Sequence, residues 1–301
     1  MYSKVCILGS TGFVGSSIYD RLIKSNINVL GLSRSSTSNN RTIVDFNNIE
    51  ELKSQFISCD VIINAMGSYK PSDFLDGGEQ HFLEVNELAR KIEASIVNAG
   101  IKRFVQISSA GTVYGEFKGR PFKETDLTLP ETDYGRLKVL EEYLYRQVCE
   151  KHEIEYVCLR LSNPFGNSRE VDHGFVDVLA NSIKSKSLFK SYAGEHYRRD
   201  FIHVNDMAYI IEKLSFMKLD TNSEVFNVGS GKSESLYLLA KLVNEKIENV
   251  EFVDNRSKGD INIVDIDNTK LNSILGDEWR YCLPTTYLER VMKRVMEEQY
   301  V

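Results

Sequence analysis

Residues 8–17, Leu-Gly-Ser-Thr-Gly-Phe-Val-Gly-Ser-Ser, decide the fold of this chain. This stretch follows the apolar run Val5–Leu8, which has the composition of a buried strand, and it leads into the helix-like segment Ser16–Lys24. The chain therefore begins with a strand, a glycine-rich turn and a helix, in that order. A strand that passes through such a turn into a helix is the first unit of a parallel α/β sheet.

The three glycines of this turn predict a phosphate-binding site. Gly9 permits the tight turn, Gly12 lets the backbone approach a phosphate, and Gly15 lets the helix pack closely on the strand. The helix then presents backbone N–H groups and the positive end of its dipole to an anion. We therefore predict that the turn binds the pyrophosphate of a dinucleotide cofactor through the following residues: Gly9, Thr11, Gly12, Phe13, Val14 and Gly15.

The composition of the 301-residue chain argues against several other classes of protein. The formal net charge is −6 and acidic and basic residues are interspersed, so no basic stripe indicates a nucleic-acid partner or a membrane surface. The chain contains no long uncharged apolar run, and Met1–Lys4 leads directly into the first strand, which leaves no room for a signal peptide. We therefore expect a cytoplasmic protein.

The cysteines and histidines do not have the spacing of a metal site or of a disulfide framework. The five cysteines are scattered without a C-x-x-C string, and the five histidines show no H-x-x-x-H string. We expect the cysteines to be reduced thiols, as is usual in a cytosolic protein, and we expect no metal.

Short apolar strands alternate with longer helical segments through the first half of the chain. The predicted strands are Val5–Leu8, Asn28–Leu32, Asp60–Asn64, Arg103–Ser108 and Tyr156–Arg160. The predicted helices are Ser16–Lys24, Ile49–Ile57, Glu79–Ala99 and Tyr134–Lys151. This alternation predicts a Rossmann-type α/β fold, a doubly wound parallel sheet whose ligand lies outside the carboxyl ends of the strands.

After Arg160 the alternation loosens, which indicates a smaller second part. The elements predicted there are helices at His173–Lys186, Ser233–Lys246 and Thr285–Glu298, and strands at Glu224–Val228 and Glu251–Val253. We expect residues 1–166, with about 202–234, to form the dinucleotide-binding domain. We expect residues 167–201 and 235–301 to form a substrate-binding cap, with the active site in the cleft between the two.

Tyr134 and Lys138 are the second informative feature, in the string Tyr134-Gly135-Arg136-Leu137-Lys138 at the start of a predicted helix. At this spacing the two side chains lie one turn apart on the same face. A phenol is normally too weak an acid for catalysis at neutral pH, and a neighbouring ammonium strengthens it. The pair therefore predicts a tyrosine that acts as general acid or base with the support of the lysine.

Further strings along nearly the whole chain resemble the extended short-chain dehydrogenase/reductases, the NAD(P)-dependent epimerases, dehydratases and ketoreductases of nucleotide sugars. Besides the glycine-rich turn and the Tyr-Lys pair, the matching strings are Asp60–Ala65, Lys102–Ser109, Val113–Gly115, Arg160–Gly166, Arg199–Asp206 and Phe226–Gly231. The resemblance implies a homodimer joined through the helices Glu79–Ala99 and Tyr134–Lys151.

The resemblance also assigns roles to individual residues. It implies that Ala65 and Gly67 lie beside the cofactor, and that Lys138 holds the ribose of its nicotinamide. It implies that Asn163 and Arg199 bind the nucleotide-sugar substrate.

Arg256 is the predicted third substrate-binding residue, and it departs from the family pattern. The family's late arginine comes three residues before an aspartate, whereas Arg256 comes four residues before Asp260. Lys258 is the alternative for this contact.

Two hydroxyl groups are candidates for the third polar group of the active site. The family's serine or threonine lies four residues before the tyrosine of its V-Y-G string, and here Ala110 occupies that position. Ser109 precedes Ala110 directly, and Thr112 follows it two positions later. Either Ser109 or Thr112 would complete the site beside Tyr134.

The end of the second strand favours NADP over NAD. In relatives that use NAD, this position carries an acid, whose carboxylate accepts hydrogen bonds from the ribose hydroxyls and repels a 2′-phosphate. Here Ser33 occupies it, and Arg34 follows with a guanidinium suited to a 2′-phosphate. In the alternative interpretation, Arg34 stacks on the adenine ring and does not discriminate.

These observations predict an NADPH-dependent reductase of a 4-keto-6-deoxy nucleotide sugar, in the synthesis of a surface polysaccharide such as O-antigen or capsule. Tyr134 would protonate the oxygen of the carbonyl that is reduced. An NAD-dependent nucleotide-sugar 4-epimerase is the alternative, because the same residues serve both reactions. A cofactor-binding sensor without catalysis is a more distant alternative, since such relatives usually lack the Tyr-Lys pair.

Overall fold

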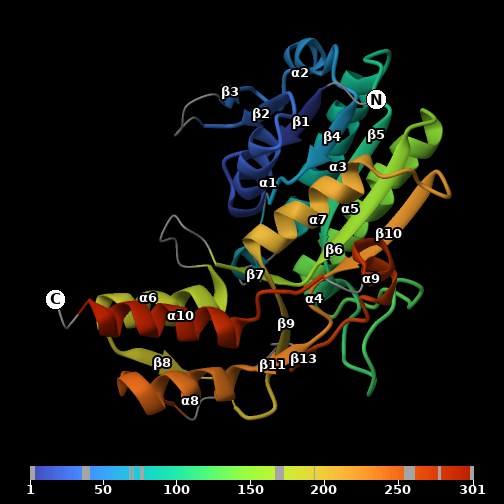
Figure 1. Ribbon diagram of the computed structural model, residues 1–301. Coiled ribbons are helices and arrows are strands. Elements are labelled where there is room, and N and C mark those ends of the chain that lie inside the picture. The colour runs from blue at the N-terminus through green and yellow to red at the C-terminus, as the bar shows by residue number, and fades with distance from the viewer. Residues whose placement is uncertain are drawn as a thin grey trace.

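A seven-stranded sheet forms the centre of the molecule, with the strand order β10-β6-β5-β4-β1-β2-β3 (Figure 1). Every neighbouring pair in it is parallel, which confirms the predicted Rossmann-type sheet. The strands are β1 (Val5–Leu8), β2 (Val29–Ser33), β3 (Arg41–Ile43), β4 (Val61–Asn64), β5 (Arg103–Ser109), β6 (Glu155–Leu161) and β10 (Ser223–Val228). This computed structural model describes residues 4–35, 41–67, 69, 71–74, 78–166, 173–192, 194–253, 262–276 and 279–298.

Successive side chains of the strands enter two apolar cores, one on each face of the sheet. In β1, Val5 and Ile7 belong to one core, and Cys6 and Leu8 belong to the other. The first core is covered by α1 (Phe13–Lys24) and α7 (Val204–Phe216), and the second by α2 (Ile49–Phe56), α3 (Glu79–Ile96) and α5 (Asp133–Lys151). A continuous apolar run is what a strand needs when both of its faces are buried.

Because all seven strands are parallel, their carboxyl ends meet at one edge of the sheet. The glycine-rich turn follows β1 at this edge, Ser33 ends β2, and Ser109 ends β5. Two short elements complete the edge: η1 (Pro71–Phe74) after β4, and α4 (Ala110–Val113) after β5.

A separate apolar core lies beyond this edge, in the lower half of Figure 1. It is formed mainly by α6 (Gly174–Ser185), α8 (Leu236–Ile247) and α10 (Pro284–Glu297). Two small sheets accompany it: β8 (Phe189–Ser191) with β12 (Val250–Phe252), and β11 (Ser233–Ser235), β9 (Arg198–His203) and β13 (Ile263–Val264) with β7 (Asn163–Phe165) paired to β9. The smaller part is therefore assembled from segments that leave the central sheet and return to it, and the exact boundaries between the two parts stay a prediction.

Two predicted helices begin three residues away from the expected residue. Helix α1 begins at Phe13 instead of Ser16, directly after the N-cap Gly12. The prediction of a helix from Ser233 is wrong for its first three residues, which form β11 antiparallel to β9. Helix α8 starts only at Leu236, where the Ser235 hydroxyl oxygen accepts a hydrogen bond from the Leu238 N–H.

Candidate active site

A cavity of about 780 Å³ lies at the carboxyl edge of the sheet, between the ends of β1, β2 and β4 and the helix α3. Its size is typical of a pocket for a small molecule or cofactor. Seven of the predicted cofactor-binding residues line it: Gly9, Thr11, Gly12, Ser33, Arg34, Ala65 and Gly67. The other four, Phe13, Val14, Gly15 and Lys138, are not part of its lining.

The glycine-rich turn brings backbone segments together more closely than any side chain allows. Gly9 has a φ of +78°, in the left-handed region, and a Cβ there would lie 2.8 Å from the carbonyl oxygen of Ala65. A Cβ on Gly15 would lie 2.2 Å from the carbonyl oxygen of Gly9, so α1 packs on the turn only when this residue is glycine. Gly12 is the N-cap of α1 and provides no side-chain cap, and the first turn contains no acidic residue, which suits a bound phosphate.

No carboxylate follows directly at the end of β2, where the ribose of the cofactor's adenosine is expected. Ser33 is buried and its hydroxyl donates a hydrogen bond to the carbonyl oxygen of Ser35 at 3.0 Å. Arg34 is exposed and lines the cavity. The end of β2 therefore presents an exposed guanidinium to the cavity, beside a buried serine.

Helix α5 carries Tyr134 and Lys138 at its first turns. The N-cap Thr132 accepts a hydrogen bond from the Gly135 N–H at 3.1 Å. A Cβ on Gly135 would lie 2.6 Å from the carbonyl oxygen of Thr112, so this glycine lets the start of α5 pack directly against α4. Lys138 Nζ lies 5.9 Å from the centre of the Tyr134 ring, as expected for residues one turn apart.

Lys138 is buried and forms an ion pair with Glu141, whose Oε2 lies 2.8 Å from Lys138 Nζ. Burial by itself lowers the pKa of a lysine, but the Glu141 carboxylate outweighs this effect, so the pKa of Lys138 is raised. Lys138 therefore stays charged near Tyr134. The sequence interpretation missed Glu141, although its position three residues after Lys138 places it on the same helix face.

The two candidate hydroxyls differ in their surroundings. Ala110, at the position of the family's hydroxyl, is buried with Val113 and Tyr114 in a small apolar cluster. Thr112 Oγ1 is buried and has no hydrogen-bond partner among the described residues. Ser109 is half-buried and forms no side-chain cap on α4. A buried hydroxyl without a partner is unusual, which makes Thr112 the stronger candidate for a contact with a bound molecule.

A second buried ion pair lies beneath α5 and was also missed by the sequence interpretation. Arg160 of β6 donates to Glu142, with Nη2 2.7 Å from Oε2, and it also donates to the Tyr114 hydroxyl at 3.0 Å. The Tyr114 hydroxyl in turn donates to Asn227 Oδ1 at 2.6 Å. This network fixes α5 to β6 and β10 behind the candidate catalytic residues.

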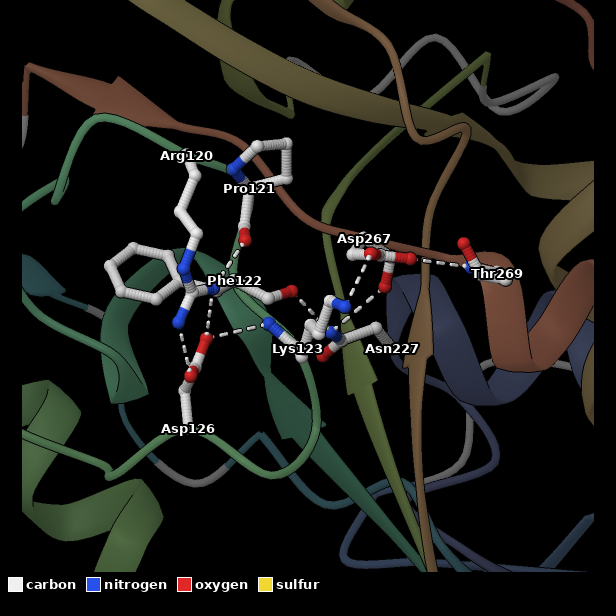
Figure 2. A network of polar contacts seen from close by, with 8 residues as sticks. All are labelled: Arg120, Pro121, Phe122, Lys123, Asp126, Asn227, Asp267 and Thr269. Carbon is white, nitrogen blue, oxygen red and sulfur yellow. Dashed lines mark hydrogen bonds and ion pairs between the residues drawn. The ribbon is translucent and has the colours of Figure 1, made fainter.

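Asn227 continues this network to the surface and holds the loop that leads into α5 (Figure 2). Its Nδ2 donates to the carbonyl oxygens of Phe122 and Asp267, at 2.9 and 3.1 Å. In the same loop, Arg120 and Asp126 form a bidentate ion pair with N–O distances of 2.8 and 2.7 Å. Phe122, in the loop that precedes α5, is therefore tied to β10.

Two of the three predicted substrate-binding residues lie on the small sheet that contains β7 and β9, and neither lines the cavity. Asn163 of β7 donates from Nδ2 to the carbonyl oxygen of Asp200 at 2.7 Å. Arg199 of β9 donates from Nη1 to the carbonyl oxygens of Arg198 and Asn262, at 3.0 and 2.9 Å. Arg256 and the alternative Lys258 lie outside the described residues.

The thiols of all five cysteines are free. Within the part of the chain that the structure describes, no group of three or more histidine, cysteine or acidic side chains is placed to hold a metal ion. No helix in these same ranges is both long and apolar enough to cross a membrane.

Comparison with known proteins shows that the chain is similar to enzymes of nucleotide sugars. Residues 5–229 match the model of the NAD dependent epimerase/dehydratase family. The dTDP-4-dehydro-6-deoxyglucose reductase of Escherichia coli is 31% identical over 180 residues, which cover 59% of this chain and 54% of that protein. The UDP-glucose 4-epimerase of Lacticaseibacillus casei is 25% identical over 303 residues, which cover 90% of each chain.

The same arrangement of elements occurs in a solved structure. The UDP-glucose 4-epimerase of Thermotoga maritima, determined with UDP-glucose, superposes with a TM-score of 0.83 over 99% of this chain and all of that one, at 20% identity.

Proposed function

The chain belongs to the NAD dependent epimerase/dehydratase family, an enzyme family of nucleotide sugars, and we propose that it is an NADPH-dependent reductase of a 4-keto-6-deoxy nucleotide sugar. The observation that carries this proposal is the end of β2. Ser33 stands where an acid would select NAD, and Arg34 lies exposed on the cavity wall. A guanidinium there stabilises a 2′-phosphate, and NADPH is the cofactor that cells use for reduction.

In this proposal, the residues of the chain bind, orient and protonate. The cofactor, when bound, supplies a hydride to the carbonyl carbon. Tyr134 donates its proton to the carbonyl oxygen, and Thr112 or Ser109 orients that oxygen by a hydrogen bond. Lys138 stays charged, strengthens Tyr134 as an acid and binds the nicotinamide ribose. Removing a general acid of this kind costs roughly a hundredfold to ten-thousandfold in rate.

Asn163 and Arg199 are the proposed contacts to the nucleotide sugar, together with Arg256. The side chains of Asn163 and Arg199 already bond to backbone carbonyls of the small sheet, so they are held in place before substrate arrives. We further propose a homodimer joined through α3 and α5, which pack side by side, and a role in surface-polysaccharide synthesis.

An NAD-dependent nucleotide-sugar 4-epimerase is the second candidate. It is supported by the similarity to the Lacticaseibacillus casei epimerase, which extends over 90% of the chain, whereas the similarity to the reductase covers 59%. An epimerase oxidises and re-reduces its substrate on one bound cofactor, so Tyr134 and Lys138 serve it equally well.

The two candidates are separated by the consumption of cofactor. We expect stoichiometric loss of NADPH absorbance when a 4-keto-6-deoxy nucleotide sugar is added, and no conversion of a 4-hydroxyl nucleotide sugar when no cofactor is supplied. The matched control is Tyr134→Phe, which retains the aromatic ring and removes the hydroxyl group that donates the proton. If the purified protein carries tightly bound NAD and interconverts two 4-epimers, the epimerase proposal would replace the reductase proposal.

A further inference from the structure

A carboxylate that the mechanism above does not use lies directly behind the catalytic pair. Glu141 is 5% exposed and Lys138 is 6% exposed, and the two side chains meet at 2.8 Å in the interior. A buried carboxylate is costly unless it is paired, so its presence beside Lys138 requires an explanation.

The Glu141 carboxylate is connected through side chains of the sheet to the wall of the cofactor cavity. Gln106 of β5 donates from Nε2 to Glu141 Oε2 at 3.4 Å, and Asn64 of β4 donates from Nδ2 to Gln106 Oε1 at 2.8 Å. Asn64 Oδ1 then accepts a hydrogen bond from the N–H of Met66, a residue that lines the cavity, at 3.2 Å. Glu141 is therefore held in one orientation by a chain of hydrogen bonds that ends at Met66 on the cavity wall.

The other ionisable groups around the pair do not supply this negative charge. Tyr134 and Tyr145 approach from α5, and Cys158 approaches from β6. Glu142, the next carboxylate on the helix, is already bonded to Arg160. Burial raises the pKa of Glu141, and the nearby Lys138 ammonium opposes this effect. Burial also raises the pKa values of Cys158 and Tyr145, which keeps the thiol and the phenol neutral.

We propose that Glu141 is a positioning residue that keeps Lys138 charged and directed toward Tyr134, and that it thereby sets how strongly Tyr134 acts as an acid. The inference rests on the proposed role of Tyr134 in the reaction. It adds a third member to the Tyr-Lys pair, one that touches neither substrate nor cofactor. The Lys138 ammonium is then stable in a buried position, because its counter-charge is buried with it.

The test is the pH dependence of kcat in Glu141→Gln. Without the carboxylate, burial favours the neutral amine, so Lys138 loses its proton at a lower pH than in the wild type. The variant should therefore lose little activity at pH 6 and progressively more at higher pH, with kcat about tenfold or more below the wild type by pH 9. Glu141→Asp keeps the charge and should restore the wild-type profile at least in part.

Glu142→Gln is the matched control, because it makes the same change at the adjacent residue of the same helix. It should lower the melting temperature and leave the shape of the pH profile unchanged. A wild-type profile in Glu141→Gln, or an equal change of profile in both glutamine variants, would overturn the inference and leave Glu141 with a purely structural role.

Titration of the lysine Cε resonances by NMR gives a second measurement that needs no turnover. The resonance that is missing from the Lys138→Met spectrum is that of Lys138. It should titrate at a lower pH in Glu141→Gln and Glu141→Asp than in the wild type, and the decrease should be larger in the glutamine variant. Unchanged titration in both variants contradicts the inference. Full activity of Tyr134→Phe would instead contradict the proposed function, so the two failures are distinguishable.

Discussion

At the carboxyl ends of β1 and β4 the site is built on closely packed backbone, and its charged groups, such as Arg34, are exposed, whereas behind the ends of β5 and β6 the charged side chains are buried. Gly9 and Gly15 bring backbone within the distance at which a methyl group would collide. On α5, the side chains of Lys138, Glu141 and Glu142 are all buried and form ion pairs. Under the proposed function, the first region recognises a ligand by close backbone contacts and by the exposed charge of Arg34, while the second supports the reaction and needs its buried charges balanced.

The difference between the regions predicts where single substitutions act. A substitution of an exposed side chain on the cavity wall should alter only the affinity for a ligand. A change that removes one member of a buried ion pair should alter stability or rate, because the remaining charge has no water to solvate it.

The largest effect is expected for Arg160→Met, which leaves the Glu142 carboxylate buried without its partner. Breaking such a pair typically costs about 3–5 kcal/mol of unfolding free energy. Thermal or urea unfolding of the apoprotein measures it. The control is the double variant with Glu142→Leu, which removes both charges and should recover much of the loss. If Arg160→Met were as stable as the wild type, the buried ion pairs would not set the second region apart from the first in stability.

Tyr134→Phe should reduce kcat by roughly a hundredfold or more, the scale of a lost general acid. The dissociation constant of the cofactor should change little, because Tyr134 is not among the residues that line the cavity. Steady-state kinetics with saturating substrate and a fluorescence titration of the cofactor separate the two effects. Wild-type turnover in the variant would remove Tyr134 from the mechanism.

Arg34→Ala tests the open region, and its effect should be confined to the choice of cofactor. A charged contact with a phosphate contributes about 1.5–3 kcal/mol, so the wild type should prefer NADPH over NADH by about tenfold or more. The variant should lose most of this preference and keep its stability and its affinity for NADH. If the wild type binds both cofactors equally, or NADH more tightly, the epimerase becomes the better interpretation.

The smallest effect is expected for Asp126→Asn, which opens the exposed ion pair with Arg120 in the loop of Figure 2. Arg120, with a backbone contribution from Lys123, holds the pKa of Asp126 at about 2, so the carboxylate is ionised throughout the working range. Solvent screens such a pair, and we expect a melting temperature within about 2 °C of the wild type. A large destabilisation would show that this loop is energetically part of the buried network around Asn227.

The open region is also the one that the sequence predicts best. The strand, the turn and the start of α1 depend on residues adjacent in the chain, so a local pattern contains the information. A local pattern does not contain the information for the buried network, because Gln106 and Glu141 come from different elements and meet only once the sheet is formed. Their polar side chains carry no periodic signal of their own.

Three other features were not predicted from local patterns, each for a different reason. Helix α7 follows directly after β9 and was not predicted, because the string Arg199–Asp206 was interpreted as a motif and not as the junction of two elements. The string Ser233–Ser235 became a strand because β9 lies beside it, which is a tertiary effect. The choice between Ser109 and Thr112 depends on the direction of their hydroxyl groups, which their positions in the sequence do not determine.

The position of β10 at one end of the sheet has a consequence for synthesis on the ribosome. The strands β1 to β6 can pair as soon as residue 161 has emerged, but β10, which covers the edge of β6, is made only after β7, α6, β8, β9 and α7. At about 5–20 residues per second, that edge stays uncovered for on the order of several seconds. During this interval the nascent chain exposes unpaired backbone groups of β6, and premature association between neighbouring chains is most dangerous there.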